Sequence, residues 1–110
     1  MSKLKICSTD DLVPNSGVCA LLNDDTEQEQ VAIFYLPDTE QKVFAINNWD
    51  PIGQANILSR GIICNIDGEL TVASPLYKQH FSLTTGKCLE EDATVKTYTI
   101  SIEGDAVYLN

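Results

Sequence analysis

The sequence predicts an all-β fold in a single domain over residues 1–110, and three observations indicate it. Short runs rich in Val, Ile, Thr, Phe and Tyr recur about every ten residues, separated by turn residues, as in β-sandwiches and small barrels. No segment sustains a helical period. A chain of 110 residues is also long enough to bury about two-thirds of its unfolded surface around one core.

The β-rich runs define the expected strands. We predict strands at residues 3–7, 17–22, 30–36, 42–47, 62–66, 69–73, 97–103 and 106–109. Asp67-Gly68 joins two of these runs, and Asp-Gly is the favoured pair where both residues of a hairpin turn need positive φ. Near the end of the chain, Tyr98, Ile100 and Ile102 alternate onto one face of a strand.

Three stretches depart from the β pattern. Residues 8–14 suggest a helical turn, which Ser8 or Thr9 could cap. Residues 47–61 and 74–93 are long connections, and loops of that length in a small domain are usually functional. Both connections leave the same region of the predicted sheet, so we expect them to meet in space.

Composition excludes two classes of partner. The net charge is −9, from 16 acidic and 7 basic residues, and the sequence contains no Lys/Arg cluster. Nucleic-acid binding needs a basic patch, so it is excluded. No apolar run reaches the length of a membrane helix, and the first residues lack the apolar stretch of a signal peptide. We therefore expect a cytoplasmic protein that does not bind membranes.

The four cysteines are scattered along the chain, at Cys7, Cys19, Cys64 and Cys88. They form no Cys-x-x-Cys or Cys-x-His unit, so their spacing does not predict a zinc site. Without an export signal, such cysteines are expected to be reduced and structural. A reactive or metal-binding thiol is the alternative.

The two long connections resemble the metal-binding loops of a Rieske domain, through the motifs "WDPIG", "SPLYK" and "FSLTTG". The resemblance implies an antiparallel β-sandwich or barrel with two long loops at one tip. In that family the loops carry Cys-x-His and Cys-x-x-His, which hold a [2Fe–2S] cluster through two thiolates and two imidazoles. The matching positions here are Asp50 and Ile52 in the first loop, and Ser74 and Tyr77 in the second.

The residues at these vestigial positions are unsuited to an iron–sulfur cluster. Ile52 has no donor atom, Ser74 is a neutral hydroxyl, and Tyr77 would have to lose a proton with a pKa of about 10. His80, the only histidine, lies three residues beyond Tyr77. A lone histidine is more often a hydrogen-bonded structural residue than a ligand. We therefore expect no metal and no cofactor in this chain.

A Rieske-like chain without cluster ligands is similar to one family in particular. Over essentially its whole length the chain resembles the NirD-type small subunit of the cytoplasmic NAD(P)H-dependent nitrite reductase, most specifically in "NNWDPIGQANILSRGI" and "SPLYKQHFSLTTGKCLE". The resemblance implies a large-subunit partner that carries FAD, a [4Fe–4S] centre and sirohaem and reduces nitrite to ammonium in nitrate assimilation. This chain is then an oxidoreductase subunit without catalytic residues. The alternative is a stand-alone β-barrel interaction module with no redox role.

Several residues at the tip admit two interpretations. Asp50 is expected to form an Asx turn before Pro51, with a general base or partner anchor as the alternative. Trp49 fits either core packing or a partner interface. Tyr77 is expected to fill the space of the missing cluster, or to join Lys78 at an interface. A hydrolase built from Ser74, His80 and Asp50 is excluded, because no nucleophile elbow surrounds Ser74.

Overall fold

The computed structural model describes residues 4–23 and 28–109. The strands are β1 (Leu4–Ser8), β2 (Ser16–Asn23), β3 (Gln28–Tyr35), β4 (Val43–Asn47), β5 (Trp49–Asp50), β6 (Ala55–Asn56), β7 (Ile62–Ile66), β8 (Glu69–Ala73), β9 (His80–Ser82), β10 (Thr97–Tyr98), β11 (Ile100–Glu103) and β12 (Ala106–Leu109). Two short 3₁₀ helices complete the fold, η1 (Thr9–Asp11) and η2 (Leu58–Arg60). The all-β prediction is confirmed, and no helix in the described ranges is long and apolar enough to cross a membrane.

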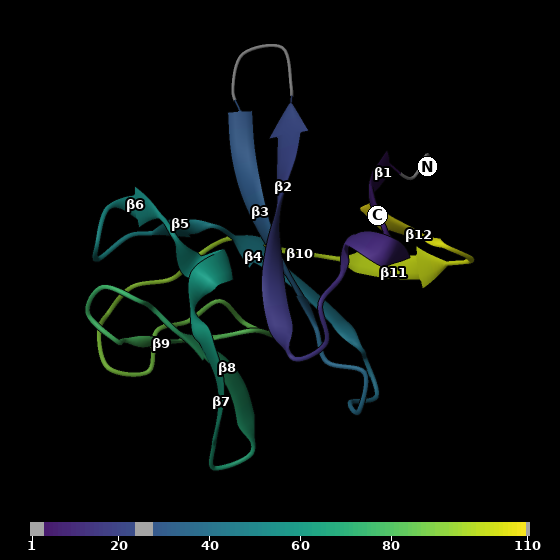
Figure 1. Ribbon diagram of the computed structural model, residues 1–110. Helices are drawn as coiled ribbons and strands as arrows, with labels where there is room; N and C mark the ends of the chain where they lie inside the picture. The colour runs from purple at the N-terminus through teal and green to yellow at the C-terminus, as the bar shows by residue number, and fades with distance from the viewer. Residues whose placement is uncertain (1–3, 24–27, 110) are drawn as a thin grey trace.

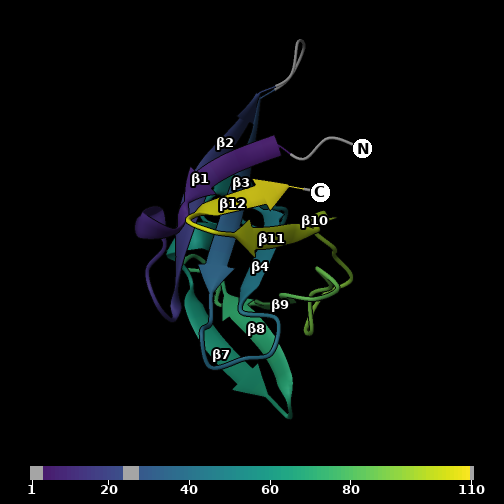
Figure 2. The ribbon, with the colours of Figure 1, turned by 90° about the vertical axis from the view of Figure 1, so that its right-hand side faces the viewer.

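The strands form four antiparallel sheets. The largest has the order β10-β4-β3-β2, and it is flanked by the sheets β1-β12-β11 and β7-β8-β9 and by the small pair β5-β6. Figure 1 shows β3 and β4 at the centre, with β7–β9 on one side and β11–β12 on the other. In Figure 2, β1, β12 and β11 cross in front of β3 and β4.

The central strands are buried on both faces because each face packs against a different sheet. Successive side chains of a strand point to opposite faces. On one face, Phe34 and Phe44 pack with Val72 and Phe81 of the β7-β8-β9 sheet. The other face carries a second cluster of buried residues: Val31, Ile33, Val43 and Ala45, with Ile100 and Val107 from the β1-β12-β11 sheet. This double burial explains why β3 and β4 read as continuous apolar runs rather than alternating ones.

All eight predicted strands are present, although one of them is divided. The strand expected over 97–103 is broken at Thr99: Tyr98 pairs with Ala45 in the large sheet, whereas Ile100 pairs with Leu109 in the sheet of the chain ends. The alternation of Tyr98, Ile100 and Ile102 survives because all three side chains pack in the same cluster. Residue 3, the start of the first expected strand, lies outside the described residues.

The turns also follow the sequence closely. Asp67 and Gly68 have φ of 52° and 91°, as the hairpin prediction requires. At the expected helical turn, Ser8 occupies the N-cap of η1, and its backbone N–H donates to the Asp11 carboxylate at 3.0 Å. Strands β5, β6 and β9 were not predicted, because two or three residues are too few to show an alternating pattern.

Gly86 is required by a close approach between two loops. It has φ of 77°, and a Cβ placed on it would lie 2.1 Å from the carbonyl oxygen of Val95. A backbone hydrogen bond also joins the two residues, since the Val95 N–H donates to the Gly86 carbonyl at 2.8 Å. This bond joins the segment after β9 to the segment that precedes β10.

We predict that Gly86→Ala destabilises the fold far more than Gly104→Ala. Both glycines have positive φ, but a Cβ on Gly104 would meet nothing within 4 Å. Gly104→Ala should cost about 1 kcal/mol for the left-handed backbone, and Gly86→Ala about 2 kcal/mol more for the clash. Urea denaturation measures both values. Equal losses of unfolding free energy would show that the backbone near Val95 shifts to admit the Cβ at no energetic cost.

Candidate functional site

The two long loops close through the same backbone turn. We call residues 49–54 the first loop, residues 74–79 the second loop, and both together the tip. In the first loop the Gln54 N–H donates to the Asp50 carbonyl at 2.7 Å, and in the second the Lys78 N–H donates to the Ser74 carbonyl at 3.0 Å. Gln54 and Lys78 also share a left-handed backbone, with φ of 56° and 64°. Each loop is thus a five-residue turn with proline in second place.

The first residue of each turn points its side chain into the protein. Asp50 is 0% exposed, and its Oδ1 accepts hydrogen bonds from the N–H groups of Ile52 at 2.8 Å and Gly53 at 3.0 Å. The expected Asx turn is therefore confirmed. Ser74 is 1% exposed, and its Oγ accepts from the Leu76 N–H at 3.3 Å. The Ser74 hydroxyl in turn donates to Asp50 Oδ2, which joins the two loops.

A second contact between the loops lies at Gly53, beside the Leu76 side chain. A Cβ on Gly53 would lie 2.7 Å from Leu76 Cδ1 and 3.0 Å from Asp50 Oδ2, so a larger residue there would require the exposed Leu76 side chain to move. The prediction that the two long connections meet in space is confirmed by this contact and by the bond between Asp50 and Ser74.

The other two vestigial positions differ from each other. Ile52 is half-buried and packs against the core cluster that contains Phe81. Tyr77 is 63% exposed, so the expectation that it fills the space of a missing cluster is wrong. Asp50 and Ser74 are paired with each other inside the tip, and Tyr77 lies on the surface. Trp49, which the sequence assigned equally to core or interface, is 44% exposed.

Asn48 holds the base of the first loop, a role that the sequence analysis missed. Its side chain is 2% exposed; Oδ1 accepts from the Ser59 N–H at 2.6 Å, and Nδ2 donates to Gln30 Oε1 at 3.0 Å. Its backbone carbonyl accepts from the N–H groups of Ile57 and Leu58. The only signal was a polar residue directly after an apolar strand, which is too common to interpret alone.

His80 is a structural residue, as predicted. Its Nδ1 lies 2.6 Å from Glu90 Oε2, and its backbone N–H donates to Glu90 Oε1 at 2.7 Å. Burial acts to raise the pKa of Glu90, but the hydrogen bonds from His80 outweigh it, so the pKa lies below the usual value. Because His80 pairs with Glu90 rather than with Ser74, the structure contains no Ser-His-Asp arrangement at this site.

The cysteines do not gather at any site. All four are free thiols, and only Cys88 is buried. The expectation of a buried structural thiol therefore holds for Cys88 alone. Partial burial raises the pKa of Cys7, which disfavours a reactive thiolate. Within residues 4–23 and 28–109, no group of three or more His, Cys, Asp or Glu side chains could hold a metal ion.

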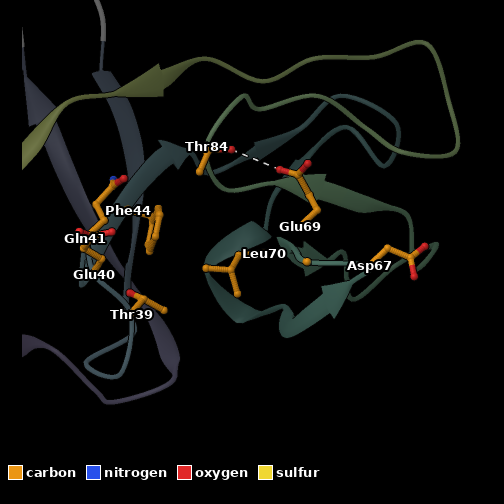
Figure 3. A pocket seen from close by; sticks show the side chains of 9 residues that line it. Thr39, Glu40, Gln41, Phe44, Asp67, Glu69, Leu70 and Thr84 are labelled. Atoms are coloured by element: carbon orange, nitrogen blue, oxygen red, sulfur yellow. Dashed lines mark hydrogen bonds between the residues drawn. The ribbon is translucent and has the colours of Figure 1, made fainter.

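A hollow of about 510 Å³ lies at another part of the molecule, between the β3–β4 connection and the β7–β8 hairpin. Phe44 and Leu70 lie on opposite sides of it (Figure 3). Its rim carries Glu40, Asp67 and Glu69, and Glu69 is already bonded to Thr84 at 3.2 Å. An open, acidic hollow without a metal-binding group is a weaker candidate site than the tip.

The fold and the paired loops define a Rieske-like domain, and the family of Rieske-like [2Fe-2S] domains matches residues 3–110. The chain is 49% identical over 111 residues to the nitrite reductase (NADH) small subunit of Escherichia coli K12, covering 99% of this chain and 98% of that one. The NMR structure of the E. coli protein NirD has a TM-score of 0.83 and 46% identity, covering 98% of this chain and 94% of that one. The chain therefore belongs to the family of nitrite reductase (NADH) small subunits.

One relative has a different architecture. The nitrite reductase [NAD(P)H] large subunit of Klebsiella oxytoca is 33% identical over 105 residues, which cover 94% of this chain but only 10% of that protein. A domain similar to this chain is thus built into a much longer polypeptide.

We predict that Ser74→Ala destabilises the protein by about 2 kcal/mol, because it leaves a buried carboxylate oxygen of Asp50 without a donor. Ser59→Ala is a matched control, since no hydrogen bond of the Ser59 hydroxyl occurs among the described residues. That variant should stay within about 0.5 kcal/mol of the parent. Urea denaturation of both variants gives the difference in their free energies of unfolding. Equal values would show that the hydrogen bond between Ser74 and Asp50 does not stabilise the fold.

Proposed function

We propose that this chain is the non-catalytic small subunit of a cytoplasmic NAD(P)H-dependent nitrite reductase, which reduces nitrite to ammonium in nitrate assimilation. The observation that carries the proposal is the 49% identity to the E. coli small subunit over nearly the whole of both chains. The large subunit would hold FAD, the [4Fe–4S] centre and sirohaem, and all electron transfer to nitrite would occur there. A stand-alone interaction module is not favoured by so complete a match.

The donor set of the tip does not fit a [2Fe–2S] cluster, although the matching family is named for one. Such a cluster requires thiolates, or imidazoles in the Rieske case. Here Asp50 already accepts three hydrogen bonds, from Ile52, Gly53 and Ser74. Ile52 offers no lone pair, and Tyr77 turns to solvent. We therefore derive no redox step in this chain.

Iron analysis tests this part of the proposal. Protein purified under conditions that preserve iron–sulfur clusters should be colourless and contain no stoichiometric iron or inorganic sulfide, because no thiolate or imidazole occupies a ligand position. A ferredoxin of the Rieske class prepared in parallel is the control. Two irons per chain with visible absorption bands would contradict the assignment.

We place the interface with the large subunit at the tip. Leu76 and Tyr77 are 50% and 63% exposed, and Trp49 is 44% exposed beside an open groove of about 660 Å³ that Pro51 and Lys96 also line. Exposed aromatic groups next to a concavity are typical anchors of protein interfaces. Lys78 adds a cation to the tip of a chain with net charge −9, so the tip differs in charge from the molecule as a whole.

We predict different effects for two substitutions at the tip. Tyr77→Ala should weaken binding to the large subunit by about 1–3 kcal/mol, with no change in melting temperature, because the ring packs little within the chain. Lys78→Glu should slow association, and the effect should shrink at high salt because a rim charge mainly steers the encounter. Surface plasmon resonance at two salt concentrations measures both effects.

Lys42→Glu is the matched control for the charge change. Lys42 is exposed, has φ of 68° like Lys78, and lies in the connection between β3 and β4, outside both loops of the tip. It should leave association unchanged. If neither tip variant alters binding, the interface lies on another face of the domain; if Lys42→Glu acts like Lys78→Glu, the effect comes from total charge alone.

A further inference from the structure

The two ends of the described chain lie together, away from the tip. β1 and β12 are antiparallel neighbours, with Leu4 directly opposite Leu109. Figure 1 shows β1 and β12 at one flank of the molecule, with β5, where the first loop of the tip begins, and the neighbouring β6 at the opposite flank. We call β1 and β12 the terminal edge.

The built-in domain of the K. oxytoca large subunit shows why the position of the two chain ends matters. About nine-tenths of that protein lies outside the segment similar to this chain, since the segment covers 10% of it. The remainder must connect to the domain through its first strand, its last strand or both. Because the two strands are neighbours, each case places the connection at the same spot, the terminal edge. The tip is then free to face the body of the large subunit.

We infer that this chain binds its large subunit one-to-one, in the position that the built-in domain takes, with the terminal edge at the place where a connecting segment would run. The inference rests on the proposed function, since it takes the large subunit as partner. A domain inside the same polypeptide is present once per large subunit. Its effective concentration at the docking position is in the millimolar range. A separate chain must reach the same position by affinity alone, which requires an interface of its own such as the tip.

The ratio of subunits is the first test. The complex of this chain with its own large subunit is purified by a tag on the large subunit, and native mass spectrometry counts both chains. Equal numbers are expected, whether the large subunit is a monomer or an oligomer. Two small subunits per large subunit, or one per two, would overturn the inference while leaving the proposed function intact. Absence of any complex would overturn the proposed function, and the inference with it.

A domain exchange tests the geometry. This chain replaces the built-in domain of the K. oxytoca large subunit at the aligned ends, and nitrite-dependent NADH oxidation is measured. The control is a circular permutant with its native ends joined by a Gly/Ser linker and new ends between Asp67 and Gly68, where a Cβ on Gly68 would meet nothing within 4 Å. As a free chain, the permutant should still bind the large subunit, which shows that it folds.

The exchanged native chain should restore activity, and the permutant should give at least about tenfold less, because its connections leave from the β7–β8 hairpin and lower the effective concentration at the docking position. Equal activity of the two exchanges would overturn the role of the terminal edge. Failure of the native exchange, with the ratio of subunits still one-to-one, would show that the separate and built-in domains bind at different places.

Discussion

The burial of β3 and β4 on both faces is the constraint on which the rest of the structure depends. A single packed sheet can cover only one face of β3 and β4. The chain must therefore provide one sheet for each apolar face. The segment between β4 and β10 provides β7, β8 and β9 for the face of Phe34 and Phe44. The two chain ends provide β1, β11 and β12 for the face of Val31 and Ile33. The tip and the terminal edge are therefore parts of different sheets, separated by the central one.

This separation lets the tip change without disturbing the core. Asp50 and Ser74 each follow shortly after a strand, β4 and β8 respectively, that is anchored in the central packing. The loops then close on themselves through backbone hydrogen bonds to the Asp50 and Ser74 carbonyls. In a cluster-bearing relative, metal–ligand bonds link two such loops; here one hydrogen bond and one contact at Gly53 link them. Most of the order in the tip is local to each loop.

The sequence revealed those features that are encoded locally. The Asp67-Gly68 hairpin, the Asx turn at Asp50 and the apolar runs of β3 and β4 each depend on neighbours in the chain, and each was predicted. The features that were missed depend on distant partners. The break at Thr99 arises because Tyr98 and Ile100 pair with different strands. The exposure of Tyr77 accompanies a hydrogen bond between Ser74 and Asp50, which lies 24 positions earlier. No short motif records such a pairing.

The residues that replace the cluster ligands also explain which side of the tip stayed buried. A carboxylate without a cationic partner is expensive to bury, and it is tolerated only when hydrogen bonds replace its hydration. Asp50 receives three donors, two from its own turn and one from Ser74. The inner positions Asp50 and Ser74 therefore remain polar, buried and paired, whereas the outer position at Tyr77 faces solvent. Two turns held by local hydrogen bonds that present the exposed aromatic groups of Trp49 and Tyr77 are suited to docking, and that is the role we propose for the tip.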